Sequence, residues 1–358
     1  MNTPVKPDTC PPTSTTASAA GSTRPRGLLG VEIAGVGSAL PQRTVTNEDL
    51  AKVMDTSDEW IVQRTGIKSR RRHDPALGES TAMLAAEATR AALADAGLSP
   101  DDLDLIITGT MTPDTPTPSV GCMVASRLGC RTIGAMDVNA ACSGFVYCLN
   151  IAHDLITLGR HRNIAVIGAD CVTRHCDFST FGRSVSVLFG DGAGAVVLRA
   201  TKDSSKGILA QAMHSDGSGA KHLYIPSCLA DFADPSQAEE RKINYVQMNG
   251  PAVFKFAVGT FPGLIEETLD LAGLAATDID HFVCHQSNQR ILQAASDRFG
   301  ITPDKLRVNI DRYGNTVGAS VPLILAELKA ESLVKPGQKV MFLAFGAGLT
   351  WASSLWQL

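Results

Sequence analysis

Cys142 is the residue whose type and position best suit covalent chemistry. It lies in DVNAACSGFVYCLN, where a strand-like run gives way to apolar residues at helical spacing from Phe145 to Ile156. This pattern places the thiol at a helix N-terminus, where unpaired amides and the helix dipole stabilise a thiolate. We therefore expect a nucleophilic cysteine with a lowered pKa. The alternative is a cysteine that only packs, because cysteine is often buried.

Two polar motifs nearer the C-terminus could complete a site with Cys142. HQSN, from His285 to Asn288, follows a strand-like run, and YGNTVGAS, which contains Asn315, opens a helix-like segment. Taken singly, His285 could be a buried structural histidine and Asn315 a turn residue beside a glycine. Because the motifs stand at strand and helix ends that correspond to the surroundings of Cys142, we expect the three side chains to meet.

That correspondence rests on an internal repeat. LADAGLSPDDLD (93–104) is similar to LDLAGLAATDID (269–280), and the same offset aligns Ile164 with Val340 and Cys142 with Gly318. β-like runs such as 104–110 and 163–170 alternate with helix-like segments such as 80–97, which is typical of α/β proteins. The sequence therefore predicts two similar α/β halves, residues 28–205 and 206–358, that meet at a central seam.

Composition excludes several classes of function. The 358 residues carry a net charge of -4, and 19% of them are charged. The chain therefore lacks the excess of basic residues that is typical of proteins that bind nucleic acid or an anionic membrane. No apolar run approaches the about 20 residues that span a bilayer. The nine cysteines, an odd number without a secretory leader, favour free thiols in the cytoplasm over a disulfide framework.

Metal and cofactor signals are weak. His281, Cys284 and His285 form a metal-like grouping, but it would need further ligands, so we expect no metal. The glycine runs at 35–40 and 190–195 lack the spacing of a dinucleotide loop, so we expect no nicotinamide cofactor. Residues 1–27 are dominated by Pro, Ser, Thr, Ala and Gly, which predicts a disordered tail; a targeting peptide is the alternative.

Six motifs together carry a family resemblance. TSDEWIVQRTGI, ACSGF, FGDGAGAVVL, HQSN, YGNT and FGAGLTW, in this order from about residue 30 to the C-terminus, resemble the β-ketoacyl-acyl-carrier-protein synthase III family of the thiolase superfamily. The resemblance implies an αβαβα fold of two duplicated halves that works as a homodimer. It also implies the first condensation of fatty acid synthesis, between an acyl-CoA primer, expected to be acetyl-CoA, and malonyl-acyl-carrier protein, without a cofactor.

The resemblance also assigns roles to residues. Cys142 would hold the acyl group as a thioester, while His285 and Asn315 would donate hydrogen bonds to the malonyl thioester as CO2 leaves. His285 must be neutral for this role. The remaining roles are the oxyanion hole, formed by the backbone N–H groups of Cys142 and Ala347; the grip on coenzyme A, formed by Trp60, Arg64, Arg174 and Asn288; and a contact with the carrier protein by Arg290.

Some residues depart from the family pattern. Ala347 replaces a common glycine, Leu349 stands where an aromatic residue is frequent, and TPS (117–119) lacks an aromatic ring that can restrict the acyl chain. The length of the primer is therefore open. The basic run KSRRRH (68–73) is interpreted either as a contact for the acidic carrier protein or as a solvated charge run.

Two other functions are compatible with parts of this pattern. One is a related synthase of a polyketide or other secondary pathway, since the chemistry and the motifs are shared. The other is a non-catalytic scaffold of the same fold that binds acyl carriers. The presence of Cys142, His285 and Asn315 together argues against the scaffold, because binding alone does not need all three.

Overall fold

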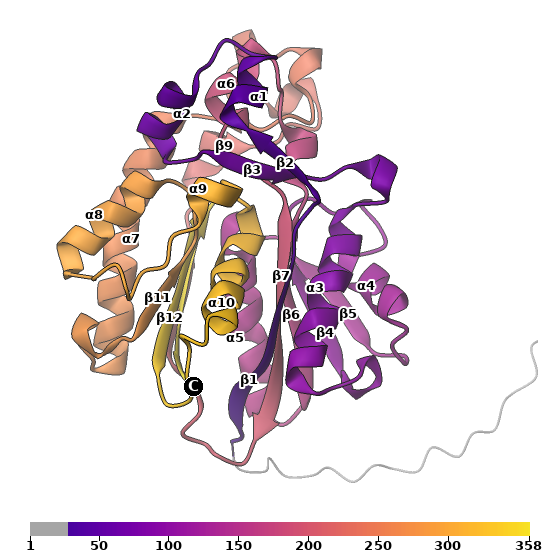
Figure 1. Cartoon of the computed structure of the whole chain (residues 1–358), viewed down its shortest axis with the longest axis vertical. Coiled ribbons are helices and arrows are strands. Elements are labelled where there is room, and N and C mark those ends of the chain that lie inside the picture. The colour runs from indigo at the N-terminus through magenta and orange to yellow at the C-terminus, as the bar shows by residue number, and fades with distance from the viewer. Residues whose placement is uncertain (1–27) are drawn as a thin grey trace, which may run out of the picture.

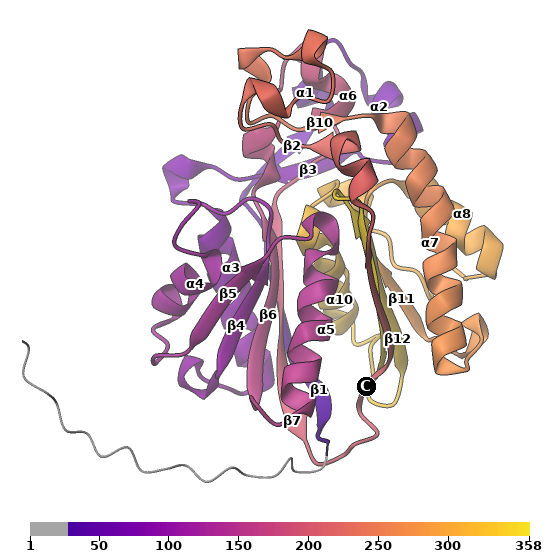
Figure 2. The same cartoon turned by 180° about the vertical axis from the view of Figure 1, so that it is seen from behind.

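Two β-sheets form the body of the molecule, with one layer of helices between them and one on each outer face (Figures 1 and 2). Helices α5 (Gly144–Thr157) and α10 (Ser320–Ala330) pack between the sheets. Helix α3 (Thr81–Ala96) covers the outer face of one sheet and α7 (Gly250–Ala272) that of the other. The layers run αβαβα, which confirms the predicted fold class.

This computed structural model describes residues 28–358, and the tail predicted for residues 1–27 lies outside the described residues. The other α-helices are α1 (Asn47–Ala51), α2 (Asp58–Thr65), α4 (Val120–Leu128), α6 (Arg183–Ser186), α8 (Gln289–Phe299) and α9 (Ile310–Tyr313). Within residues 28–358, no helix combines the length and the apolar character needed to cross a bilayer.

The first sheet has five strands in the order β1-β7-β6-β4-β5, and β4 pairs in parallel with both β5 and β6. The second sheet has four strands in the order β11-β12-β13-β8, with β11 and β12 parallel. The strand bounds are β1 (Gly30–Ala39), β4 (Leu105–Gly109), β5 (Gly134–Val138), β6 (Asn163–Asp170), β7 (Gly192–Thr201), β8 (Gly207–Ser215), β11 (His281–Cys284), β12 (Lys339–Gly346) and β13 (Thr350–Gln357).

The internal repeat predicted from the sequence is present in the elements. At the predicted offset, β4 corresponds to β11 and β6 to β12, and the helices α3 and α7 both end in a left-handed glycine, Gly97 and Gly273. Glycine suits this position because it has no Cβ to clash at positive φ. Residues 202–206 lead from β7 in the first sheet to β8 in the second, and we propose this connection as the boundary between the halves.

A cap covers one end of both sheets (Figures 1 and 2). It contains α1, α2, α6 and two small antiparallel pairs of strands: β2 (Arg43–Thr46) with β3 (Ser69–Arg72), and β9 (Leu223–Tyr224) with β10 (Gln247–Met248). Strand β6 and helices α5 and α10 all have one end beneath this cap. The cap therefore lies over one end of the seam, which is the interface between the two halves.

Candidate active site

Cys142 lies at the seam, in the turn that enters α5. The turn Ala141–Ser143 precedes Gly144, the first residue of α5, and Ala141 has a φ of 46°. Val317, which corresponds to Ala141 in the other half, has a φ of 53° just before α10. Positive φ is strained for residues with a Cβ, and such strain clusters at functional sites. Both halves thus present a strained turn at the seam.

The strand β12 runs very close to Cys142. A Cβ on Gly346 would lie 2.7 Å from the backbone nitrogen of Cys142, so only glycine fits there. Thr350 joins the two loops, because its hydroxyl shares one proton between the carbonyls of Ala140 at 2.9 Å and Ala347 at 3.0 Å. As a result, the loop that contains Ala347 is held against the nucleophile.

The protonation of Cys142 differs from the prediction. Burial, followed by the negative charge of Asp170, raises the pKa of the thiol to about 12, although the amides of Cys142 and Ala347 donate toward the sulfur and lower it. The predicted lowering by the helix N-terminus is therefore wrong for the resting protein, because desolvation of a 6% exposed residue outweighs it. The backbone N–H groups of Cys142 and Ala347 thus both point toward the sulfur of Cys142.

His285 stands directly after β11 and is neutral. Its backbone N–H donates to the carbonyl of Leu343 at 2.8 Å, and its ring meets that of Phe345 edge to face at 5.6 Å. Burial lowers the pKa of His285 to about 3. Its Nδ1 is buried and has no hydrogen-bond partner within residues 28–358, so no acceptor there stabilises an imidazolium. The imidazole is therefore neutral at neutral pH, as the role expected for His285 assumes.

Hydrogen bonds fix both the backbone and the side chain of Asn315. Its backbone N–H donates to the carbonyl of Leu188 at 2.8 Å, and its own carbonyl accepts from Gly190 at 3.0 Å. The side-chain Oδ1 accepts from the backbone N–H of Val317 at 2.9 Å. Because a backbone N–H can only donate, this contact identifies Oδ1 and leaves the NH2 group to donate to a bound molecule.

The three predicted residues line one cavity of about 490 Å³, in the size range of small-molecule sites. The structure thus brings together the cysteine, the histidine and the asparagine from three separate segments. Four more predicted residues line the same cavity, namely Trp60, Arg64, Asn288 and Arg290. Ala347 does not line it but lies in a second cavity with Cys142.

Helix α2 supplies an aromatic and a cationic group to the cavity. The guanidinium carbon of Arg64 lies 4.4 Å from the ring centroid of Trp60. Asn288 fastens this helix to α8, since its Nδ2 donates to the carbonyl of Arg64 at 3.0 Å and its Oδ1 accepts from the backbone N–H of Arg290 at 2.9 Å. Hence the Asn288 side chain joins two walls of the cavity.

Arg174 lies apart from the other predicted residues. Its Nη2 donates to Thr81 at 2.9 Å and to Asp114 at 3.1 Å, and it lines neither cavity that contains Cys142. In its place the structure brings Arg183, at the start of α6, to 5.3 Å from the Trp60 ring centroid. No motif singled out Arg183, which stands in FSTFGRSV, a stretch without an interpretable pattern.

The second cavity, of about 700 Å³, meets the first at Cys142, Phe189 and Leu223. Its walls combine apolar residues such as Met111 and Val246 with polar ones such as His175. Leu349 is not among the lining residues. Cys142 is thus reached from two sides, one through the cavity that contains His285 and Asn315 and one through this second space.

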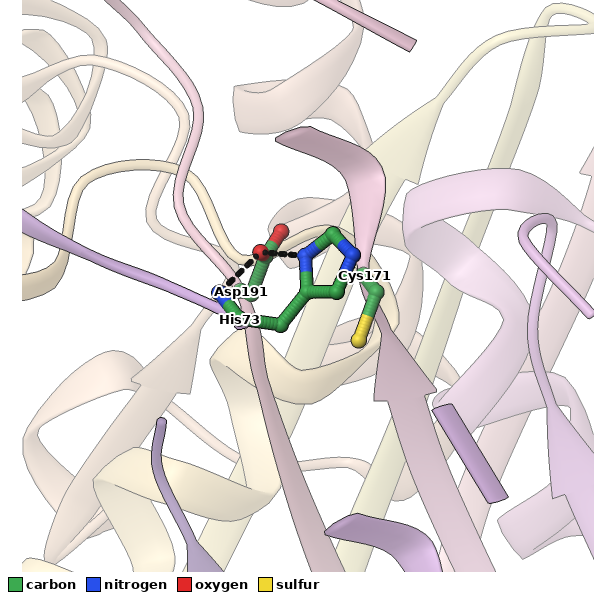
Figure 3. Close-up of side chains that lie close together, drawn as sticks. All are labelled: His73, Cys171 and Asp191. Carbon is green, nitrogen blue, oxygen red and sulfur yellow. Dashed lines mark hydrogen bonds and ion pairs between the residues drawn. The ribbon is translucent and has the colours of Figure 1, made fainter. Parts of the chain in front are cut away.

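The grouping of His281, Cys284 and His285 is not a metal site in the structure. Among residues 28–358, the possible metal ligands that do lie together are His73, Cys171 and Asp191, whose ligand atoms are within 4.8 Å of one another (Figure 3). Both carboxylate oxygens of Asp191 are already used: Oδ2 accepts from the His73 backbone at 2.9 Å and the Thr173 hydroxyl at 2.6 Å, and Oδ1 from the Thr173 backbone at 2.8 Å. We interpret this cluster as a hydrogen-bond network that joins strand ends.

The five-layered fold, with a cysteine, a histidine and an asparagine at the seam of two similar halves, defines a condensing enzyme of the thiolase fold. Family models agree: residues 136–217 match 3-oxoacyl-[acyl-carrier-protein] synthase III and residues 269–358 match its C-terminal part. The chain belongs to the β-ketoacyl-[acyl-carrier-protein] synthase III family, whose members are acyltransferases that begin fatty acid synthesis.

Individual relatives cover nearly the whole chain. The synthase III of Caldanaerobacter subterraneus is 45% identical over 323 residues, which are 90% of this chain and 96% of the relative. The crystal structure of the synthase III from Aquifex aeolicus is 40% identical, with a TM-score of 0.84 over 92% of this chain and all of that one. The priming β-ketosynthase of the R1128 polyketide pathway is 34% identical with a TM-score of 0.85, over 94% and 98% of the two chains.

Proposed function

We propose that this protein joins the acyl group of an acyl-CoA primer to malonyl-acyl-carrier protein, with loss of CO2, through an acyl thioester on Cys142. The observation that carries this proposal is the single cavity lined by Cys142, His285 and Asn315. Family membership supports the reaction, and the geometry supports the assignment of each step to a residue.

The first step is acyl transfer. The Cys142 sulfur attacks the thioester carbonyl of acyl-CoA, the coenzyme A sulfur leaves, and the thiol proton passes to it. The carbonyl oxygen becomes negative in the transition state and would accept from the N–H groups of Cys142 and Ala347. Because the resting thiol is protonated, the nucleophile forms together with its substrate rather than ahead of it.

The second step is decarboxylation and condensation. His285 and the NH2 group of Asn315 would donate to the malonyl thioester carbonyl, so the electrons of the breaking bond to CO2 are stabilised as an enolate. The enolate carbon then attacks the acyl thioester and a carbon–carbon bond forms. The bond to the Cys142 sulfur breaks, and the thiolate takes a proton from solvent. Neutral His285 suits this step, because the N–H of a neutral imidazole is a weak acid and donates a hydrogen bond without giving up its proton to the enolate.

The two cavities suit the two ends of the substrate. We assign the first to the pantetheine arm, with Trp60, Arg64 and Arg183 at the adenine through stacking and charge-assisted contacts. Asn288 would brace α2 against α8 beside them. The second would hold the acyl group beyond Cys142. Arg290, which also lines the first cavity, is proposed to meet the acidic carrier protein. No step in this scheme requires a cofactor besides the thioesters.

We also propose that the protein is a homodimer and acts in the cytoplasm. The cysteines of residues 28–358 are free thiols, as in a reducing compartment. Strand β5 forms an edge of the first sheet, and its residue Met136 is 37% exposed. An unprotected edge strand is a ready template for pairing with another chain.

Intact-protein mass spectrometry tests the first step. The purified protein is mixed with acyl-CoAs of increasing chain length, and we expect a mass gain of one acyl group that is absent in Cys142→Ala. Addition of malonyl-carrier protein should then discharge the acyl group. A folded protein that no acyl-CoA labels, or labelling that persists in Cys142→Ala, would contradict the proposal.

A further inference from the structure

Arg70, in the basic run 68–73, is a buried cation. It lies in β3 and is 1% exposed. Its guanidinium is held by neutral oxygens: Nη1 donates to the side chain of Asn47 at 2.8 Å and to the carbonyl of Val45 at 3.3 Å, and Nη2 donates to the carbonyl of Val187 at 2.8 Å. The Nε atom is buried without a partner in residues 28–358. Arg70 is therefore neither a solvated charge nor a contact for the carrier protein.

Such an arrangement is costly for fold stability alone. A buried charge that is held by carbonyl and amide groups loses more hydration than these partners return, and an apolar residue would join the same strands more cheaply. Burial lowers the pKa of Arg70 to about 10, so the side chain remains a cation at neutral pH. The retained charge and its three directed contacts indicate a geometric role.

On one side, Arg70 contacts α2, the helix that contains Trp60 and Arg64, through the side chain of Asn47. Because the Asn47 Oδ1 accepts from Arg70, its Nδ2 faces the other way and donates to Asp58 at 2.7 Å and to the carbonyl of Ile67 at 2.7 Å. Asp58 is the first residue of α2, and Ile67 follows its C-terminal cap. One amide, which Arg70 orients, thus contacts the chain at both ends of α2.

In the other direction, Arg70 contacts the segment that fixes Asn315. Val187, whose carbonyl accepts from Arg70, lines the first cavity. The next residue, Leu188, accepts from the backbone N–H of Asn315, and Gly190 donates to its carbonyl. One guanidinium therefore stands between the coenzyme A end of the cavity and the asparagine at its inner end.

We propose that Arg70 is a positioning residue that aligns helix α2 with the Asn315 segment, so that a substrate gripped at Trp60 reaches Cys142 in register with Asn315. This inference rests on the proposed function. It predicts that a change at Asn47 affects only the coenzyme A end, whereas a change at Arg70 affects both ends. A displacement of about 1 Å can reduce a rate a hundredfold, so small shifts suffice.

The experiment compares Arg70→Met, Asn47→Leu and the matched control Arg71→Met. Arg71 is the next residue of the same strand, but its Nη1 donates to the carbonyls of Pro41 and Gln42 at 3.1 Å, away from the cavity. Calorimetry gives the Kd of coenzyme A, and product formation at saturating acyl-CoA and malonyl-carrier protein gives the condensation rate. Melting temperatures are recorded for each variant.

Arg70→Met should weaken coenzyme A binding and slow condensation, each about tenfold or more. Asn47→Leu should weaken binding by a similar factor with the saturated condensation rate within about twofold of the unchanged protein. Arg71→Met should leave both within twofold. The inference is overturned if folded Asn47→Leu binds coenzyme A normally, or if Arg70→Met lowers only the melting temperature.

If Arg70→Met does not fold, Arg70→Lys takes its place, because lysine keeps the buried charge but cannot make the three directed contacts, so both losses are expected from it as well. Calorimetry also separates this inference from the proposed function. If the unchanged protein binds coenzyme A but is never acylated, the proposed function fails while the effect on α2 is still measured. Absence of coenzyme A binding in the unchanged protein would overturn both.

Discussion

For single residues at the site, burial decides the protonation state more than the nearest dipole does. The Cys142 thiol and the His285 imidazole are both kept neutral by desolvation, in opposite pKa directions. A neutral pair avoids placing an isolated charge on buried side chains before the substrate arrives. The price of this arrangement is acid sensitivity at the histidine.

The lowered pKa of His285 makes the free energy of unfolding depend on pH. The unfolded chain binds a proton at this side chain near pH 6.5, whereas burial lowers the folded pKa to about 3. Between these values the unfolded state holds more protons, so stability falls as the pH falls below 6.5. From pH 7 to pH 5 this group alone should remove about 2 kcal/mol of unfolding free energy.

Urea unfolding of the unchanged protein and of His285→Gln at both pH values checks this prediction. The variant has no imidazole to protonate there, so its loss of unfolding free energy over the interval should be smaller by about 2 kcal/mol. All other titrating groups are common to the two proteins and cancel in the difference. Equal losses would show that His285 is accessible to protons in the folded state.

Residue types could be predicted from the sequence, but their surroundings could not. Cys142, His285 and Asn315 stand in motifs whose position after strands or before helices is local information. The pKa of Cys142 depends on distant segments that exclude water, and no local pattern contains them. In the same way, the sequence does not show whether Arg174 or Arg183 reaches Trp60, because the path of the chain between these two residues decides it.

Among the elements, close backbone approaches hold the two halves together. Gly168 in β6 faces the turn before α10, where a Cβ would lie 2.1 Å from the carbonyl oxygen of Gly318 and 3.1 Å from the Cβ of Phe145. The carboxylate of Asp170, at the end of the same strand, accepts from the backbone N–H of Gly318 at 3.0 Å. Strand β6 thus contacts the turn of the other half directly.

Gly168→Ala should therefore destabilise the protein by about 3 kcal/mol or more, because backbone rather than a flexible side chain must move. The matched control is Gly263→Ala in α7, where an added Cβ meets no atom within 4 Å and the helical backbone suits alanine. This control should gain about 0.5–1 kcal/mol. Urea unfolding measures both, and a Gly168→Ala variant as stable as the unchanged protein would contradict the close approach.

The body of the fold was predictable from element patterns, whereas the cap was not. The repeat predicted the equivalence of β4 with β11 and β6 with β12, because both copies bury the same kinds of residues at the same spacing. The cap contains short pieces, such as β9 and β10 of two residues each, whose pairing joins segments more than twenty residues apart. Pairs this short have no periodicity of their own to detect.

At the scale of the whole molecule, β5 is a terminal strand of the five-stranded sheet. Strand β5 pairs with β4 on one side only, and its five residues, GAMDV, contain neither proline nor lysine to discourage further pairing. The one charge, Asp137, is turned to the N-terminus of α4, where it accepts from the backbone N–H groups of Val120 at 2.7 Å and Gly121 at 2.9 Å. This edge is where we expect a second copy to pair.

Such pairing would also brace the nucleophile, because β5 ends at Val138, only four residues before Cys142. Light scattering after gel filtration should give the unchanged protein twice the chain mass of 37.7 kDa. Met136→Lys places a charge on the edge and should yield monomers, with condensation slowed about tenfold or more as the Cys142 turn loses its support. Leu158→Lys, at a 64% exposed apolar residue after α5, is the control and should remain an active dimer. A monomeric unchanged protein, or a Met136→Lys dimer of full activity, would show that the β5 edge plays no part in assembly.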